Sequence, residues 1–165
     1  MPEHATSPAP GLLAALRPDL ARHPPFAQMA RDEVDFFLAR ATQRYYAPDE
    51  VLVAPASGPV QDIFFIREGA VTGVRGPAGS EVAFQYETGD LFPLGAAVGQ
   101  RPVTATYRAT ADTFVLVLPR TAMTDLAQRS AAFADFLTRR AASYLELSRQ
   151  AIQQSFASQV LAEQS

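Results

Sequence analysis

The chain has 165 residues, 48% of them hydrophobic and 19% charged, which is enough apolar material for the core of one globular domain. Its basic residues are all arginines, and 14 basic against 17 acidic residues give a net charge of -3, which argues against a protein that coats nucleic acid. The chain has no cysteine, and its histidines, His4 and His23, both lie near the N-terminus. Disulfides, thiol chemistry and thiolate zinc sites are therefore excluded.

No stretch reaches the roughly 18 apolar residues of a membrane span, and the first residues lack the basic and apolar regions of a secretion signal. We therefore expect a cytoplasmic chain that makes no contact with a membrane. Residues 1–10 are rich in Pro, Ala and Ser and are predicted to form a disordered leader.

The next segment, residues 11–43, is predicted to hold two or three short helices. Its apolar residues fall at helical spacing from Leu12 to Arg40, with a break at Pro24-Pro25. Asp32, Glu33 and Asp35 in this segment are expected to form a solvated helix face.

Residues 44–118 change to short β-rich runs separated by turns of Gly, Pro and Asp. The runs are RYYA, EVLVAP, VQDIFFIREG, AVTGVRG, EVAFQYE, TATYRAT and TFVLVLP. About eight short strands, none followed by a crossover helix, predict an antiparallel sheet. We expect a mainly β fold with flanking helices, built on a jelly-roll β-barrel (a double-stranded β-helix).

Residues 119–165 are predicted to form C-terminal helices. Pro119 can start a short helix from Thr121 to Gln128, and Ser130 can cap a longer one from Ala131 onward. The long helix carries an apolar stripe at steps of three and four, made of Phe133, Leu137, Ala141, Tyr144, Leu145, Ser148, Ile152, Phe156 and Val160. The stripe is too long for the barrel to cover, so a second copy of the chain is the expected partner, which predicts a homodimer. The chain ends at LAEQS with no helix stop signal, which indicates a downstream region that is missing.

Three local patterns resemble a known family. YYAPDEVLV resembles the first hairpin of the cyclic nucleotide-binding domain, DIFFIREGAVTGV its next strand pair, and YETGDLF the glycine-aspartate entry to its phosphate-binding cassette. The resemblance to this catabolite-activator-like β-roll runs from about Phe26 to Leu147. It implies a regulatory module whose candidate ligand is cyclic AMP or another nucleotide, with no further cofactor.

Two hallmark side chains of that cassette are missing. The family's cassette has, in order, glycine-glutamate, a short helix and arginine-serine-alanine. The arginine and the free N–H groups of the helix bind the cyclic phosphate, and the glutamate accepts a hydrogen bond from the ribose hydroxyl. Here Pro93, Leu94 and Gly95 stand at the first place, and Val103, Thr104 and Ala105 at the second. The segment therefore lacks the two side chains with which the family is expected to hold cyclic AMP.

The candidate ligand-binding residues all lie in residues 92–105, which we call the cassette segment. They are Phe92, Pro93, Leu94, Gly95, Ala96, Arg101, Val103, Thr104 and Ala105. Pro93 could start a short helix whose N–H groups bind either an anion or water.

Several of these residues also have a structural interpretation. Arg101 could turn toward an anion or be exposed in its turn. Apolar side chains at Leu94 and Ala96 leave a segment that either packs shut or accepts a less charged ligand. Thr104 and Thr106 could offer hydroxyls or act only as strand formers.

The variant cassette FPLGA with RPVTATYRA also resembles the N-terminal module of bacterial signalling proteins that carry CBS domains and a nucleotidyltransferase region. On that resemblance the chain itself is not an enzyme, and transferase activity would belong to residues outside it.

Two functions remain open from the sequence. One is a ligand-sensing module that shifts its C-terminal helix, and the other is a ligand-free dimerisation module with a vestigial pocket. Rival classes are weaker. A cupin-like metal site needs histidines on strands, and no predicted strand has one. A DNA-binding helix-turn-helix would be expected after the strands, where the sequence predicts only a short helix and the long helix.

Overall fold

The computed structural model describes residues 10–76 and 81–140. In chain order the elements are α1 (Pro10–Leu20), the 3-10 helix η1 (Phe26–Gln28), α2 (Arg31–Arg40), β1 (Thr42–Tyr46), β2 (Val51–Val53), the 3-10 helix η2 (Pro55–Ser57), β3 (Asp62–Glu68), β4 (Ala70–Arg75), β5 (Glu81–Glu87), β6 (Leu91–Phe92), α3 (Leu94–Val98), β7 (Thr106–Ala109), β8 (Thr113–Pro119) and α4 (Arg120–Arg129). Residues 131–140 are helical as well. None of the described helices is both long enough and apolar enough to cross a lipid bilayer.

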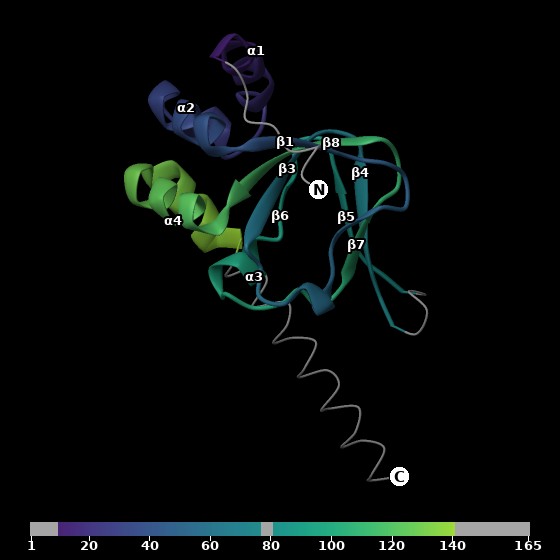
Figure 1. Cartoon of the computed structure of the whole chain (residues 1–165). Coiled ribbons are helices and arrows are strands. Elements are labelled where there is room, and N and C mark those ends of the chain that lie inside the picture. Colours follow the sequence, from purple (N-terminus) through teal and green to yellow (C-terminus); the bar gives the residue numbers. More distant parts are fainter. Residues whose placement is uncertain (1–9, 77–80, 141–165) are drawn as a thin grey trace, which may run out of the picture.

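The strands form two antiparallel sheets of four strands each. Sheet A has the order β1-β8-β3-β6, and sheet B has the order β2-β7-β4-β5. The predicted mainly β, antiparallel fold is confirmed, although the two sheets form an open roll rather than a closed barrel. In Figure 1 the helices α1, α2 and α4 lie on the side of sheet A, and α3 lies at the lower end of the roll.

Burial along the strands explains this asymmetry. In β3 and β8, the central strands of sheet A, Ile63–Ile66 and Val115–Leu118 are all buried. A strand with continuous apolar residues needs cover on both faces, and sheet A has the other sheet on one face and helices on the other. In β7 of sheet B the buried residues Tyr107 and Ala109 alternate with more exposed ones. Alternation of this kind is typical of a sheet with one solvated face, so the outer face of sheet B needs no helix.

The predicted cap at Ser130 is confirmed, and it joins three helical segments. Its Oγ accepts a hydrogen bond from the Phe133 N–H (3.1 Å) and donates one to Glu33 Oε1 of α2 (2.8 Å). The same Glu33 oxygen accepts from the Ala30 N–H (3.0 Å) at the start of α2. One hydroxyl therefore fixes the start of helix 131–140 against α2.

Ser130→Ala is expected to lower the free energy of unfolding by about 1 to 2 kcal/mol, because the cap is lost and a half-buried carboxylate loses a donor. Denaturant unfolding followed by far-ultraviolet circular dichroism measures the change. Thr124→Ala is the matched control, since its exposed hydroxyl donates only within α4. Its effect should stay within about 0.5 kcal/mol, and equal effects of the two changes would contradict the role of Ser130.

The acidic residues of α2 that were expected to form a solvated face are all at least partly exposed, but two of the three also bind a specific partner. Asp35 accepts a hydrogen bond from Arg17 Nε of α1 (2.7 Å), and Glu33 binds Ser130. Asp32 is exposed. The partners lie 18 and 97 positions away in the chain, so the spacing of the acidic residues could not reveal them.

Asp62, at the start of β3, has its pKa raised above the usual value by burial, which the nearby Arg44 guanidinium partly offsets. A carboxyl whose pKa is raised in the folded state stabilises the fold below its unfolded pKa and loses that contribution as the pH rises. Asp62→Asn is therefore expected to stabilise the protein slightly at pH 7, by less than about 1 kcal/mol because the side chain is only half-buried. Unfolding at pH 3 and pH 7 checks this, since the gain should vanish at pH 3.

Candidate functional site

Five aromatic rings lie between the two sheets near the cassette segment, and Phe84 and Tyr86 among them are half-buried. We call this set the aromatic ladder: Phe64, Phe92, Tyr86, Tyr107 and Phe84. The Phe92 ring of β6 stacks on Tyr86 with centroids 4.6 Å apart, and it lies 5.5 Å from Phe64 of sheet A. Tyr107 lies 5.4 Å from Phe92 and 5.9 Å from Phe84. The rings thus form a continuous contact from sheet A to the far edge of sheet B.

Strand geometry places these rings together. Phe84 and Tyr86 are two residues apart on β5, so they point to the same face of sheet B. Gly73, on the neighbouring strand β4, leaves room for them, because a Cβ there would lie 2.9 Å from Tyr107 Cε1 and 3.2 Å from Phe84 Cδ2. A side chain at Gly73 would push two rings of the ladder out of place.

The structure brings most of the predicted ligand-binding residues together, and it places them in the core. Their exposed fractions are 1% for Phe92, 6% for Leu94, 8% for Ala96, 5% for Val103 and 1% for Ala105. Pro93 is also buried and Gly95 is half-buried. Helix α3 begins at Leu94, directly after Pro93, and buries Leu94, Ala96 and Ala97 in the same core. The first part of the cassette segment therefore packs into the core, whereas Val98 and residues 99–102 are exposed.

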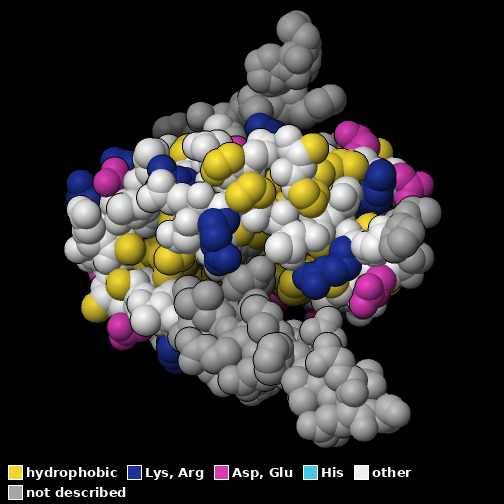
Figure 2. Space-filling view, turned by 90° about the horizontal axis from the view of Figure 1, so that it is seen from below, with side chains coloured by type: hydrophobic (Ala, Val, Ile, Leu, Met, Phe, Trp, Pro, Cys, Tyr) yellow, Lys and Arg dark blue, Asp and Glu magenta, His cyan; other side chains and the backbone are white. Residues whose placement is uncertain are grey.

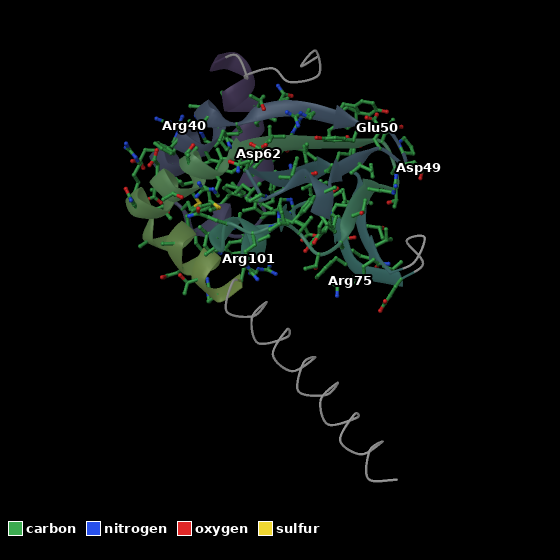
Figure 3. The ribbon with its side chains drawn as sticks, turned by 60° about the horizontal axis from the view of Figure 1, so that its bottom comes forward. Arg40, Asp49, Glu50, Asp62, Arg75 and Arg101 are labelled. Carbon is green, nitrogen blue, oxygen red and sulfur yellow. The ribbon has the colours of Figure 1, made fainter. Side chains whose placement is uncertain are left out.

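Arg101 and Thr104 are the predicted site residues that lie outside this core. Arg101 is exposed, and its side chain lies beside Gly99, where a Cβ would approach Arg101 Nε to 2.6 Å. Figure 3 places Arg101 below α3 and Arg75 at the end of β4, both at the lower rim of the molecule. From below, apolar side chains gather between arginines on this face (Figure 2).

Arg75 is a functional-site candidate that no sequence pattern indicates. Arg75 Nη2 donates to Thr104 Oγ1 (3.0 Å), and both line a surface hollow of about 440 Å³ with Thr106 and Arg108. A guanidinium from β4 therefore reaches the threonine of the cassette segment, although Val103 occupies the place of the expected arginine. The two residues are 29 positions apart, so no local motif could show the pair.

Comparison of the sequence with models of known protein families identifies the family of this chain. The model of the cyclic nucleotide-binding domain matches residues 43–130, which is just over half of the chain. The chain belongs to the cyclic nucleotide-binding domain family. The match begins at the second residue of β1, includes the other described strands and ends at the cap residue Ser130. Domains of this family are regulatory rather than catalytic.

Solved structures show the same fold. The Thermus thermophilus Catabolite Activator Protein is 21% identical with a TM-score of 0.63, over 82% of this chain and 62% of that one. The regulatory domain of Toxoplasma gondii PKA, co-crystallised with cAMP, is 18% identical with a TM-score of 0.69, over 80% and 50%. The sensor domain of the transcriptional regulator DNR from Pseudomonas aeruginosa is 14% identical with a TM-score of 0.66, over 78% and 92%.

The chain therefore spans about half to three fifths of the first two of these proteins, and nearly all of the sensor domain. A search of curated proteins finds no match. The comparisons thus establish the family and the fold of the chain. Its ligand has to be inferred from the residues of the site.

Proposed function

We propose that this cyclic nucleotide-binding domain is a regulatory module, and that the interior of its roll beside the cassette segment has no room for cyclic AMP. The stacking of Phe92 between Tyr86 and Phe64 carries the proposal, since these rings occupy the interior beside the cassette segment. A cyclic phosphate there would meet buried Val103 and Leu94 instead of a guanidinium and a carboxylate. Each missing charge-assisted hydrogen bond weakens binding by about 1.5 to 3 kcal/mol.

The output of the module is proposed to run through its C-terminal helices. Ser130 links helix 131–140 to Glu33 of α2, and Phe133, Phe136 and Leu137 of that helix are buried in the main core. A change in the roll that moves α4 must therefore also move residues 131–140. Most of the stripe expected to form a homodimer lies after residue 140, outside the described residues, so the dimer remains a proposal. The control of a nucleotidyltransferase region in a longer protein is likewise a proposal, supported by the regulatory character of the family.

Calorimetric titration of the chain with cyclic AMP, cyclic GMP, cyclic dinucleotides, ATP and AMP tests the closed interior. No saturable heat is expected up to millimolar nucleotide. Light scattering on the same sample is expected to show a dimer. Saturable heat with a cyclic nucleotide would overturn the proposal and favour a sensor with a rebuilt cassette.

A further inference from the structure

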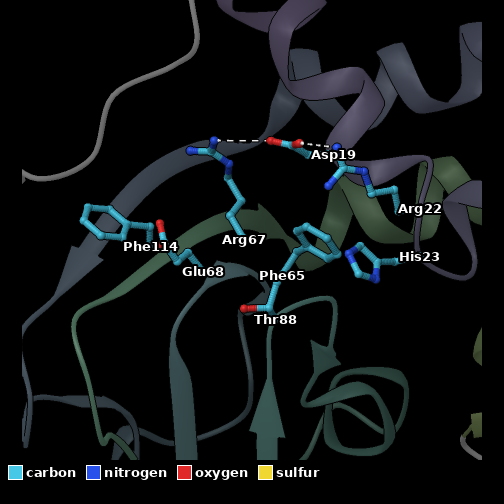
Figure 4. A pocket seen from close by; sticks show the side chains of 8 residues that line it. All are labelled: Asp19, Arg22, His23, Phe65, Arg67, Glu68, Thr88 and Phe114. Carbon is cyan, nitrogen blue, oxygen red and sulfur yellow. Dashed lines mark ion pairs between the residues drawn. The ribbon is translucent and has the colours of Figure 1, made fainter.

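A second pocket, of about 420 Å³, lies between the end of α1, the loop that follows it and one end of sheet A (Figure 4). Its lining residues are Asp19, Arg22, His23, Phe65, Arg67, Glu68, Thr88 and Phe114. None of them belongs to the cassette segment, so this pocket is separate from the site described above.

Arg67 of β3 is the unusual group in this pocket. Its side chain is only 28% exposed, and its closest carboxylate oxygen, Asp19 Oδ2, is 3.6 Å from Nη2, longer than a hydrogen bond. Its Nε is buried and has no hydrogen-bond partner among the described residues. A guanidinium keeps its charge when it leaves water, so its N–H groups need acceptors. The exposed part of the Arg67 guanidinium faces the pocket and has only the long contact to Asp19 as an acceptor among the described residues.

Asp19 does not fill that role, because it is shared. In Figure 4 its carboxylate lies between two arginines, with Arg22 Nη2 3.9 Å from Oδ1 on the other side. The remaining carboxylate of the wall, Glu68, is exposed. The two arginines and two carboxylates of the wall balance in charge. A ligand with one negative charge is therefore repelled less by Asp19 and Glu68 than a phosphate monoester with two.

The other walls are aromatic. Phe114 is 42% exposed, an unusual state for a large apolar side chain, and the His23 ring lies 6.0 Å from Phe65. Gly89, with a φ of 97°, follows Thr88, and a Cβ there would run into the His23 ring. The imidazole is thus held against the turn that joins β5 to β6. Phe114 and His23 lie at opposite ends of the pocket (Figure 4), so a ligand beside Phe114 would meet one flat apolar face.

We propose that this pocket binds a small aromatic monocarboxylate, with its carboxylate on Arg67 and its ring against Phe114. The pairing gives the accessible end of the Arg67 guanidinium a carboxylate acceptor and covers an exposed aromatic ring. The walls come from α1, β3 and the turn before β6, so a bound ligand would connect the N-terminal helices to the strand that enters the cassette segment.

Benzoate is the probe, titrated calorimetrically into the full chain, with benzyl alcohol and inorganic phosphate as comparators. Saturable binding of benzoate is expected, and binding of both comparators should be at least about tenfold weaker. Arg67→Met is expected to weaken benzoate binding at least about tenfold, while Arg31→Met, at an exposed position of α2, should leave it unchanged.

Phe114→Ala is a second variant, which tests the pocket even if Arg67→Met does not fold. Its side chain is partly exposed, so the variant should fold normally while binding benzoate several-fold more weakly. The absence of saturable benzoate binding would overturn the proposal and would mean that water alone faces Arg67. Phosphate binding as tight as that of benzoate would also overturn it. So would an unchanged benzoate affinity in both Arg67→Met and Phe114→Ala. This experiment is independent of the cassette segment, so its failure leaves the proposed function standing.

Discussion

Val103→Arg, which restores the arginine that the family resemblance places at this position, is expected to lower the free energy of unfolding by about 3 to 5 kcal/mol. Val103 is 5% exposed in the main apolar core, with Leu94 and Ala97 of α3 in the same cluster. An arginine there would be a buried charge without a carboxylate partner, and its volume would strain the packing. The substitution should therefore destabilise the domain without creating affinity for cyclic AMP.

Thr121→Arg provides the comparison for this variant, because it adds the same side chain at an exposed position of α4. Its unfolding free energy should stay within about 0.5 kcal/mol of the unaltered chain. If Val103→Arg is as stable as Thr121→Arg and binds cyclic AMP, the interior is open and the proposed closure is wrong.

Phe26→Ala is expected to have an effect of similar size, a loss of about 3 to 5 kcal/mol. Phe26 of η1 is 1% exposed and makes edge contacts with Phe37 of α2 (4.8 Å, 69°) and Phe65 of β3 (5.2 Å, 86°). The ring therefore joins the N-terminal helices to the outer face of sheet A, and its removal leaves a cavity between them. The chain has no tryptophan, so circular dichroism is the suitable signal for the unfolding curve.

Phe114→Ala separates this packing effect from the mere loss of an aromatic side chain. Phe114 is 42% exposed on β8, and its truncation should change the stability by less than about 1 kcal/mol. Similar losses in Phe26→Ala and Phe114→Ala would show that η1 is not the connection between the helices and the sheet.

Local patterns were sufficient to predict most of the elements. The runs EVAFQYE and TFVLVLP coincide with β5 and β8, because both are bounded by turn residues, and α4 begins one residue before the predicted Thr121. The two-residue strand β6 was not predicted, since two residues are too short to show an alternation. The cap at Ser130 was predicted because capping depends on one residue and its immediate neighbours.

The site could be predicted only in part, because its decisive contacts are not local. The sequence identified the missing cassette side chains and left open whether the cassette segment packs shut. It could not show that Phe92 meets Tyr86 and Phe64, since stacking depends on how three strands of two sheets come together. The pairs of Arg75 with Thr104 and of Arg67 with Asp19 were missed for the same reason. The alternation of Phe84 and Tyr86 on β5 was a usable signal for an aromatic interior.

In the proposed function, the aromatic ladder occupies the interior of the roll in place of a cyclic nucleotide. Nuclear magnetic resonance of the Tyr86 and Tyr107 rings during addition of cyclic AMP tests it directly, because both rings lie in the ladder. The account predicts that their signals stay in place up to millimolar cyclic AMP. Saturable shifts of both rings, with slow exchange typical of tight binding, would contradict it.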